Sequence, residues 1–462
     1  MKKYIIAFTC IAILGMSVID CGEEKSDQVP VINRIHTDGM WIKDEDGRTL
    51  ILHGANISNY AKHAPGYISW HTPEDYERMR EWGFNAVRLL IFWVALEPSP
   101  GSFDEEYLDE VEQRVEWSAA NGLYVILDMH QDLYSEKYTG DGAPEWACLD
   151  DDLPFEQQTP WNRNYTEPAV KKAFDSFWEN RENLQQHFID SWKLVAERFK
   201  DNQTVIGYDL YNEPFFGNLL PEEFEEEHLT PFYEKLITQM QEIDPNHLYF
   251  IEPHALTSAG TESYLKKINL TDLGYAVHYY HAGVHEGNDY NLDPTPLEYA
   301  ADLRESEARY LETPWIMDEF GVNPETVNGL VYLEDLLNIL DEKMVGWTYW
   351  SYDKGGGFCM LDSEGEEREI MPLLIRPYPQ KIAGLLKSYS FDYDDKVFEL
   401  VFEDDGKASG PTVLFVPADR HYPQGFDVSL SDGTYSFDES TQILEYSSDG
   451  TGNEHHLTIT PK

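Results

Sequence analysis

The chain has 462 residues, of which 42% are hydrophobic. It is long enough to bury a large core and to form a second, smaller domain, and this composition excludes global disorder. The formal net charge is −51, which argues against nucleic acid and anionic membrane surfaces as partners, because both are negatively charged.

The chain begins with a pattern that is typical of an export signal. Two lysines precede an apolar run that is short for a membrane-spanning helix, so we expect no stable span. We predict a signal peptide over residues 1–20 and a polar tether over residues 21–32. The pattern resembles a bacterial lipoprotein signal, which makes Cys21 a lipidation candidate, although Asp20 stands where a small residue is expected. The protein is therefore expected to be exported, either freely secreted or lipid-anchored at the cell surface.

Two cysteines remain outside the signal, Cys148 and Cys359. In an exported protein they form either one disulfide or two free thiols, and the sequence does not decide between these. The sequence has no CxxC motif and no histidine–cysteine cluster, so we predict no metal site.

A repeated alternation of strand-like and helix-like segments runs from about residue 48 to residue 355. It predicts an α/β fold, a (β/α)8 TIM barrel that occupies residues 33–375. The predicted strands are residues 50–56, 85–92, 123–129, 205–210, 248–252, 275–280, 315–317 and 346–350. The predicted helices are residues 73–82, 105–121, 184–199, 230–243, 297–311 and 332–344.

The pattern of hydrophobic and polar residues changes near the sequence RPYP, which starts at Arg376. Short alternating runs follow, separated by Asp-Gly turns, and predict a C-terminal all-β sandwich domain over residues 376–462. The predicted strands are residues 397–402, 412–416, 427–430, 442–446 and 455–460.

The segment from residue 133 to about residue 183 lies between the third and fourth predicted strands. It is long for a loop of a barrel and rich in aromatic residues, so we expect a functional role. It either lines an apolar groove or forms a small core of its own under the loop.

Active sites of such barrels lie at the carboxyl ends of the strands. Two carboxylates, Glu213 after the fourth strand and Glu319 after the seventh, therefore face each other across the mouth of the barrel. Glycoside hydrolysis needs such a pair. The polar or aromatic residues at these strand ends are Arg88, His130, Asp132, Asn212, Glu213, His278, Tyr280, Glu319 and Trp350.

The motifs NEP at Asn212 and EFG at Glu319 resemble glycoside hydrolase family 5. The resemblance implies that Glu213 is the catalytic acid/base and Glu319 the nucleophile of a retaining reaction. It implies that Arg88 keeps the nucleophile ionised, and that Asn212 binds the 2-hydroxyl of the sugar. The remaining substrate contacts that it implies come from His278, Tyr280 and Trp350.

Longer motifs resemble the endoglycoceramidase branch of this family, which cleaves intact glycan from ceramide. They are SNYAKHAP, VRLLIFWVALEPSPG, LDMHQDLYS, GDGAPEWA, AFDSFW, YDLYNEPF and RPYPQKIAG, and they span nearly the whole mature chain. This resemblance implies that Lys62, His130 and Asp132 bind sugar, and that aromatic loops hold the ceramide.

The chain departs from the family pattern at three places. Asp318 stands beside the nucleophile where glycine is frequent, and either alters the pKa of Glu319 or points away, because neighbours on a strand face opposite sides. Tyr211 replaces a more common methionine. Residues 281–291 look particular to this chain and bear on headgroup preference.

Two alternatives remain open. Another family 5 β-glycosidase, either an endoglucanase or a glucosylceramidase or steryl-glucosidase, would share both glutamates. A non-catalytic glycan-binding protein on the same barrel is less well supported, because all the expected catalytic residues are present. We expect a monomer that acts on a glycosphingolipid substrate and needs no cofactor, because two carboxylates suffice for the chemistry.

Overall fold

The computed structural model describes residues 34–462. The predicted signal peptide, the tether and Cys21 lie outside the described residues. Among the helices of the described part, none combines the length and the apolar character needed to cross a membrane.

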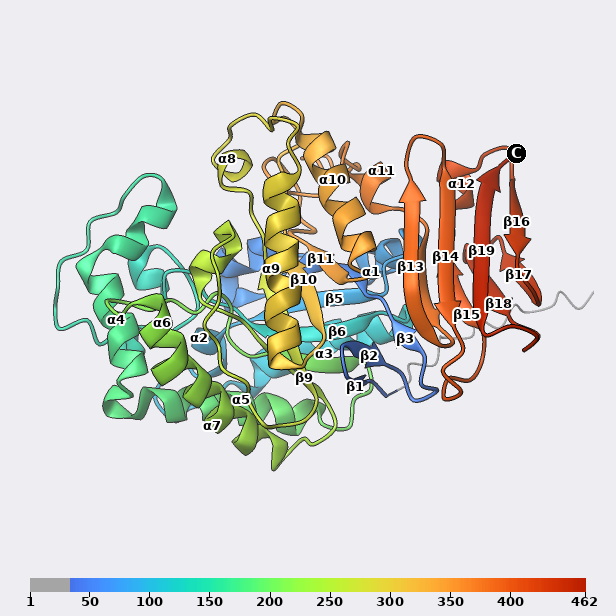
Figure 1. The fold of residues 1–462 in the computed structure, drawn as a ribbon. Coiled ribbons are helices and arrows are strands. Elements are labelled where there is room, and N and C mark those ends of the chain that lie inside the picture. Colours follow the sequence, from blue (N-terminus) through green and yellow to red (C-terminus); the bar gives the residue numbers. More distant parts are fainter. Residues whose placement is uncertain (1–33) are drawn as a thin grey trace, which may run out of the picture.

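The centre of the molecule is a closed barrel of eight parallel strands, which confirms the predicted fold (Figure 1). Every residue of these strands is buried, because helices and loops cover the outside of the barrel and side chains fill its interior. In barrel order the strands are β4 (His53–Ile57), β5 (Ala86–Ile91), β6 (Tyr124–Met129), β7 (Val205–Asp209), β8 (Leu248–Ile251), β9 (Leu273–His278), β10 (Trp315–Glu319) and β11 (Gly346–Tyr349).

Amphipathic helices surround the barrel at the six predicted positions, α4 lies within the long segment of residues 133–183, and the ends of the helices follow local chemistry. In α1, for example, Thr72 and Asp75 form a capping box and Pro73 occupies the first turn. The main helices are α1 (Pro73–Glu81), α3 (Glu105–Ala120), α4 (Pro168–Trp178), α5 (Leu184–Phe199), α7 (Thr230–Gln241), α9 (Thr295–Leu311) and α10 (Gly329–Glu342).

Beside the barrel lie two antiparallel sheets, made of the orange and red strands of Figure 1 together with the blue amino-terminal strands. One sheet has the order β13 (Leu385–Asp392), β14 (Val397–Glu403), β19 (Glu454–Pro461) and β16 (Phe426–Leu430). The other has the order β1 (His36–Asp38), β2 (Trp41–Lys43), β3 (Thr49–Leu50), β12 (Tyr378–Ile382), β15 (Thr412–Phe415), β18 (Ile443–Ser447) and β17 (Thr434–Asp438).

The amino-terminal strands belong to the second of these sheets. Residues 36–50, which the sequence grouped with the barrel, form the strands β1, β2 and β3, and β3 pairs with β12. The single strand expected at residues 50–56 is divided, with its first part in the sheet and its second part, β4, in the barrel. The first described residues therefore tie the sandwich to the barrel.

Buried contacts join the sandwich to the barrel. Arg376 lies 2.8 Å from Asp341 of α10, and the ring of Tyr378 stacks on His53 of β4 at 3.7 Å between centroids. Gly83, in the turn before β5, has a φ of +79°, and a Cβ there would lie 2.2 Å from the ring of Phe415. Only glycine allows this close approach.

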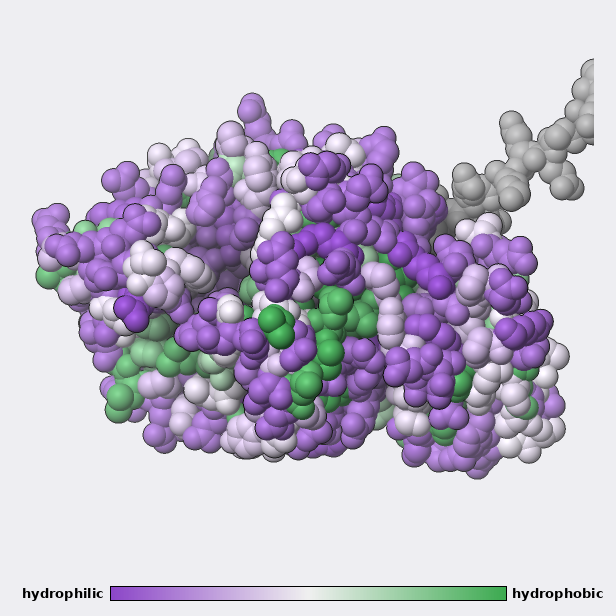
Figure 2. Space-filling model, turned by 90° about the horizontal axis from the view of Figure 1, so that it is seen from above, coloured by the Kyte–Doolittle hydropathy of each residue, from purple (hydrophilic) through white to green (hydrophobic). Residues whose placement is uncertain are grey.

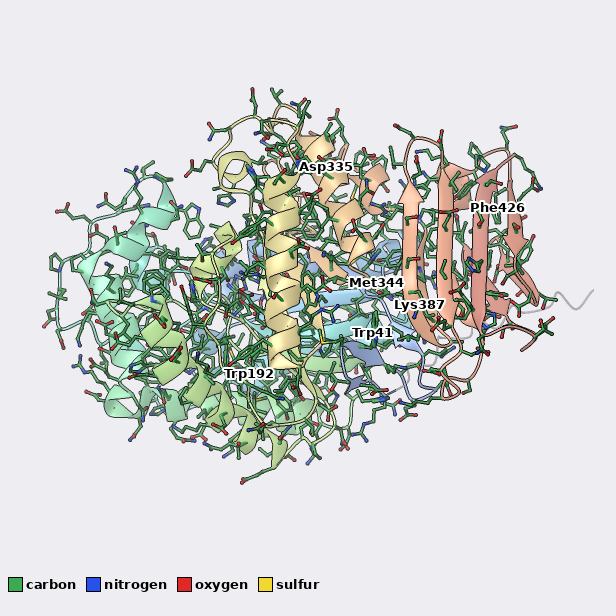
Figure 3. All side chains as sticks on the ribbon, in the orientation of Figure 1. Trp41, Trp192, Asp335, Met344, Lys387 and Phe426 are labelled. Atoms are coloured by element: carbon green, nitrogen blue, oxygen red, sulfur yellow. The ribbon has the colours of Figure 1, made fainter. Side chains whose placement is uncertain are left out.

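Side chains fill both halves of the molecule. In Figure 3, Trp192 of α5 lies in the barrel half and Phe426 of β16 lies in the sandwich. The Trp192 indole is fully buried and donates a hydrogen bond to the carbonyl of Leu210, 3.0 Å away, which fixes α5 beside β7. Hydrophilic side chains cover most of the face in Figure 2, as the large negative charge predicts, with hydrophobic groups in smaller patches.

Cys148 and Cys359 are both free thiols. This decides between the two states that the sequence left open.

Candidate active site

A cleft with a volume of about 750 Å³ opens at the carboxyl ends of the barrel strands. It brings together most of the residues predicted from the strand ends, which supports the expected position of the site. The predicted residues that line it are Lys62, His130, Asp132, Asn212, Glu213, Tyr280, Glu319 and Trp350. Arg88 and His278 do not line it, but contact the two glutamates.

Glu213 and Glu319 stand close together. One carboxylate oxygen of each, together with an imidazole nitrogen of His278, lies within a set of atoms no more than 4.8 Å apart. Retaining glycosidases hold their two carboxyl groups about 5–5.5 Å apart, whereas inverting enzymes need about 6.5–9.5 Å to fit a water. The spacing therefore favours the retaining geometry.

Glu319 is held as an anion. Arg88 Nη1 donates to its Oε1 at 2.8 Å, and the hydroxyl of Tyr280 donates to its Oε2 at 3.0 Å. Burial alone would raise the pKa of Glu319, but the charges of His278 and Arg88 outweigh burial and lower it below its ordinary value. An ionised carboxylate at the end of β10 is what a nucleophile requires.

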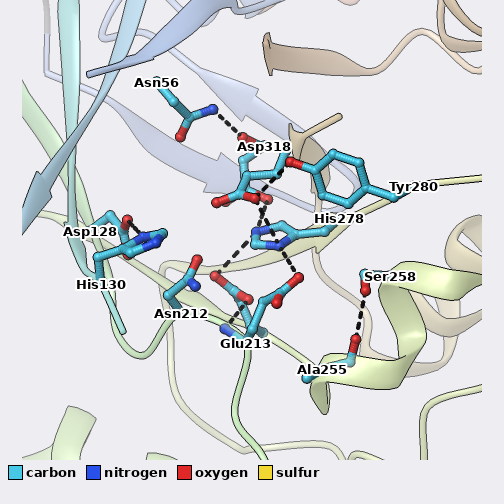
Figure 4. A network of polar contacts seen from close by, with 12 residues as sticks. Asn56, Asp128, His130, Asn212, Glu213, Ala255, Ser258, His278, Tyr280 and Asp318 are labelled. Carbon is cyan, nitrogen blue, oxygen red and sulfur yellow. Dashed lines mark hydrogen bonds and ion pairs between the residues drawn. The ribbon is translucent and has the colours of Figure 1, made fainter. Parts of the chain in front are cut away.

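Glu213 differs from Glu319 in that its pKa is raised. Burial raises its pKa, while the hydrogen bond with His278 Nδ1, 2.9 Å from Oε1, acts against the rise (Figure 4). Its backbone has a φ of +42°, and it is fixed by Gln131, whose side chain donates to the Glu213 carbonyl, and by Glu252, which accepts from the Glu213 amide. A carboxyl group that retains its proton is suited to act as the acid.

Arg88 lies at the centre of a buried network beneath this pair. Its guanidinium donates to Asn212 Oδ1 at 2.8 Å, and this bond orients the residue next to Glu213. It also forms ion pairs with five buried acids, which are Asp128, Asp209, Glu252, Asp318 and Glu319. With so many acids around one guanidinium, not all can be ionised, and the pKa of Asp209 is raised, by burial and by Glu252.

The strand-end argument missed several of these network residues. Glu252 ends the fifth predicted strand, and the same rule applied to that strand would have found it. Asp128 lies inside β6 and Asp209 is the last residue of β7. In the predicted strands both stand one residue before the end, and the sequence gives no signal that separates them from structural acids. Asn56, at the end of the first barrel strand, accepts a hydrogen bond from Arg88 at 3.0 Å.

One part of the cleft is polar. We define the polar wall as Lys62, His130, Asp132 and Asp141. Lys62 Nζ donates to Asp132 Oδ2 at 2.5 Å and lies 4.2 Å from the centroid of the Trp350 ring, while the His130 ring stacks on the same indole at 5.4 Å. The Trp350 ring therefore packs against this wall.

Charges within the polar wall are strongly coupled. Burial, and the adjacent Asp132, raise the pKa of Asp141 to about 7. Burial and Lys62 act to lower the pKa of His130, but Asp128, 2.7 Å from Nδ1, raises it to about 9. The wall therefore presents ammonium, imidazolium and carboxylate groups, a set that suits the hydroxyl groups of a sugar.

Another part of the cleft is apolar and begins next to Glu213. We define the apolar wall as Trp161, Tyr165, Phe215, Phe216, Ala255, Leu256 and Ala259. Phe215 and Phe216 follow Glu213 on the same loop, and the ring of Tyr165 lies 4.7 Å from that of Phe215. Trp161 and Leu256 are 48% and 43% exposed, so part of this wall faces solvent.

The long segment of residues 133–183 divides between the two roles expected for it. Trp161 and Tyr165 reach the cleft. Most of its other aromatic residues pack in the hydrophobic core, among them Tyr134, Tyr138, Phe174, Phe177 and Trp178. Much of the apolar wall comes instead from the loops after β7 and β8, which the sequence did not single out.

Among the described residues, four groups of acidic and histidine side chains in and beneath the cleft are close enough to hold a cation, the first being His130, Asp132 and Asp141. Two others contain His278, with Glu213 and Glu319 or with Glu252 and Asp318, and the last is Asp128, Asp209 and Glu252. In each group a side-chain cation already sits on a carboxylate, Lys62 on Asp132 and Arg88 on Glu319, Glu252 and Asp318.

Two family models match the chain. Residues 44–356 match "Cellulase (glycosyl hydrolase family 5)", and residues 376–459 match "Glycoside hydrolase family 5 C-terminal domain". Together they account for the barrel and for the sandwich strands that follow it.

Similar proteins cover almost the whole chain. Endoglycoceramidase I of Rhodococcus hoagii (strain 103S) is 29% identical over 98% of this chain and 94% of its own length. The ganglioside GM3 complex of endo-glycoceramidase II from Rhodococcus sp. has 32% identity and a TM-score of 0.86, covering 92% of this chain and 100% of that one. The lactosyl-enzyme intermediate of the same enzyme has 32% identity and a TM-score of 0.84, covering 91% of this chain and 99% of that one.

Proposed function

The chain belongs to glycoside hydrolase family 5, and from that membership we propose that it is a retaining endo-β-glycosidase of glycosphingolipids. It hydrolyses the β-glycosidic bond between the oligosaccharide and ceramide. The observation that carries this proposal is the position of Glu213, which is followed on its own loop by Phe215 and Phe216 of the apolar wall. An acid that protonates a leaving oxygen stands beside the leaving group, and a ceramide leaving group requires an apolar surface there.

The reaction has two steps. Glu319 attacks the anomeric carbon while the bond to the ceramide oxygen breaks, and Glu213 gives its proton to that oxygen. Glu213, now a carboxylate, removes a proton from a water molecule that attacks the same carbon and displaces Glu319. The products are ceramide and the free oligosaccharide with its original anomeric configuration, because the carbon is inverted twice.

The surrounding residues have distinct tasks in this scheme. Arg88 and Tyr280 stabilise the ionised nucleophile. Asn212, held by Arg88 and by the carbonyl of Gln131, binds the 2-hydroxyl of the sugar, a contact that strengthens in the transition state. The polar wall binds glycan hydroxyls, and Trp350 supports the sugar at the cleaved bond.

Two solved relatives support this assignment. The endo-glycoceramidase II structures named for ganglioside GM3 and for a lactosyl-enzyme intermediate share this fold over almost their whole length. A lactosyl group bound to the enzyme is the covalent state that a retaining mechanism passes through.

The direct test is to incubate the protein with lactosylceramide and with a ganglioside in mild detergent and to identify the products by mass spectrometry. The control is Glu319→Gln, which keeps the shape of the side chain and removes its negative charge. Intact oligosaccharide and free ceramide, both absent with the control, are the expected products. Release of glucose alone, or cleavage of β-glucan without ceramide release, would instead favour a glucosylceramidase, a steryl-glucosidase or an endoglucanase.

We also propose that the protein is exported and either freely secreted or anchored through a lipid on Cys21, on the basis of the amino-terminal pattern. Expression in a bacterial host with radiolabelled palmitate, beside Cys21→Ser, tests this. Label on the native chain and none on the variant would support the anchor. Unlabelled protein in the medium would support free secretion, and full-length protein in the cytoplasm would contradict export.

We propose that the protein acts as a monomer and has no nucleic-acid partner, for which the net charge of −51 is the support. Light scattering of the purified protein measures its mass in solution, and a dimeric mass would contradict the proposal.

A further inference from the structure

Asp318 lies at a bulge in β10. In the pairing of β10 with β9, Met317 is opposite Val277 and Glu319 is opposite His278, so Asp318 is an extra residue. Neighbours on a regular strand face opposite sides, and a bulge removes that rule locally. As a result Asp318 and Glu319 both reach the same guanidinium: Asp318 Oδ2 lies 3.3 Å from Arg88 Nε, and Glu319 Oε1 lies 2.8 Å from Arg88 Nη1.

The bulge is fixed on both sides. The carbonyl of Asp318 accepts a hydrogen bond from Asn56 Nδ2 at 2.8 Å (Figure 4) and another from Thr348 Oγ1 at 2.6 Å. These donors come from β4 and β11. The carboxyl group of Asp318 therefore has a defined position in the interior of the barrel, and of the two orientations open in the sequence it takes the one that faces the site.

The carboxyl group of Asp318 is poorly compensated. It is 1% exposed, and neither of its oxygens accepts a hydrogen bond from any described residue. Its nearest charged neighbours are Arg88, at 3.3 Å, and His278, whose Nε2 lies 3.5 Å from Oδ1. A buried carboxylate without hydrogen bonds is costly, so the protonated form is favoured. Burial raises the pKa of Asp318 to about 7, although Arg88 and His278 act against the rise.

The other elements around Asp318 supply further acids. Glu252, after β8, and Glu319 oppose its ionisation, and Asp209 of β7 interacts with it. Asp128 of β6 reaches the same Arg88 at 3.2 Å. The contacts from β4 and β11 are the uncharged donors named above. Ionisation of Asp318 therefore adds one negative charge to a cluster that contacts both glutamates of the site.

We propose that Asp318 is a positioning residue whose ionisation keeps the proton on Glu213 and so extends catalysis to more alkaline pH. This inference rests on the proposed function, which assigns Glu213 as the acid.

Asp318 is close enough to Glu213 for its charge to have such an effect. His278 joins the two carboxyl groups, with Nε2 3.5 Å from Asp318 and Nδ1 2.9 Å from Glu213. A nearby negative charge raises the pKa of a carboxyl group, so Glu213 retains its proton longer when Asp318 is ionised.

Removal of the Asp318 carboxyl group does not remove the positive charge of His278. Its pKa is raised well above the ordinary value, because Glu252, Glu319 and Glu213 outweigh the effect of burial. The carboxyl groups of these three residues lie within 3.5 Å of its ring nitrogens. The imidazolium therefore persists in a variant without Asp318, and the expected effect on Glu213 is the loss of a negative charge alone.

The test is the dependence of kcat/KM on pH for 4-nitrophenyl β-lactoside and for lactosylceramide, with Asp318→Asn beside the native enzyme. At acid pH Asp318 is protonated, so asparagine resembles it, and the midpoint of the acid limb stays in place. The midpoint of the alkaline limb is expected to move to lower pH by roughly 0.5–1 unit. Asp318→Ala removes the same charge and is expected to move it in the same direction, should the asparagine variant fold poorly.

Asp341→Asn is the matched control. Asp341 is also 1% exposed, has a pKa that burial raises to about 6, and pairs with an arginine, but it lies on α10 against the sandwich. Its loss is expected to lower stability and to leave both limbs in place. An alkaline limb that stays in place or moves upward in both Asp318 variants would overturn the inference about Asp318 alone. A native enzyme that hydrolyses neither substrate would overturn the proposed function, and the inference with it.

Discussion

His278 and Glu213 form a hydrogen bond of 2.9 Å between Nδ1 and Oε1, and the same nitrogen lies 3.5 Å from Oε2 of Glu319. One imidazolium therefore contacts both carboxyl groups of the site. It lowers the pKa of Glu319, and it moderates the rise that burial causes at Glu213. The two glutamates differ in proton affinity because Glu319 also has Arg88 and Tyr280.

Glu213→Ala is expected to separate the two steps of the reaction. Loss of a general acid lowers kcat/KM by about 10³-fold for lactosylceramide, whose leaving alcohol needs a proton, and far less for 2,4-dinitrophenyl β-lactoside, whose leaving group does not. Added azide is expected to restore turnover of the activated substrate and to yield lactosyl azide of β configuration, detected by NMR. An α-configured product, or an equal loss on both substrates, would contradict the assignment of Glu213.

The activity is expected to follow a bell-shaped pH profile. The acid limb of kcat/KM reports ionisation of Glu319, whose lowered pKa places the midpoint below the value of about 4.3 for a free glutamic side chain. The alkaline limb reports loss of the Glu213 proton and lies above that value, because its pKa is raised. Initial rates on an aryl lactoside in constant-ionic-strength buffers measure both. An acid limb well above the ordinary value would show that Glu319 is not stabilised as an anion.

Arg88→Lys is expected to damage both stability and activity. The guanidinium is fully buried and bonds Glu319, Asn212, Glu252 and Asp209, which a single ammonium group cannot replace. We expect the free energy of unfolding to fall by about 3–5 kcal/mol, measured by urea denaturation. The acid limb of the pH profile should move upward, because Glu319 loses the stronger of its direct donors.

Arg198→Lys provides the comparison for this variant. Arg198 also pairs with three acids, but those acids are exposed on helix α3. It should change stability little and the pH profile not at all. A native-like acid limb in Arg88→Lys would contradict the role of Arg88.

The sequence predicted the barrel and most of the site because both follow from periodic patterns. Alternation of strands and helices gives the barrel, and the position of a residue at a strand end gives Glu213, Glu319 and His278. The orientation of Asp318 was left open, because a bulge depends on pairing with β9 and leaves no mark in a single strand. The apolar wall was only partly found, because Leu256 and Ala259 are ordinary loop residues until the fold brings them to Phe216.

Lys62→Ala is expected to weaken glycan binding whatever the leaving group. Lys62 is bonded to Asp132 and lies on the face of Trp350, so its loss leaves a buried carboxylate without its cation and removes a donor to sugar. A charged hydrogen bond contributes about 1.5–3 kcal/mol. We therefore expect kcat/KM to fall about 10- to 100-fold, equally for lactosylceramide and for the aryl lactoside. A loss confined to lactosylceramide would place Lys62 on the lipid side.

Phe216→Ala is expected to give the opposite pattern and so to locate the lipid. Phe216 is half-buried in the apolar wall, where its ring lies 4.4 Å from that of Phe215, and it has no contact with Glu319 or the polar wall among the described interactions. Loss of an aromatic contact with an alkyl chain costs about 1.5 kcal/mol, which corresponds to roughly tenfold in kcat/KM. The loss should appear with lactosylceramide and be absent with the aryl lactoside, which has no alkyl chains.

Leu292→Ala, at a 57% exposed residue away from the cleft lining, is the matched control. An equal loss of activity on both substrates would contradict the placement of the ceramide against Phe216. Methyl β-lactoside has no long alkyl chain but has a leaving alcohol that needs a proton, so the variant should hydrolyse it as fast as the native enzyme does. A slower reaction with it would mean that the substitution displaces Glu213, which shares a loop with Phe216.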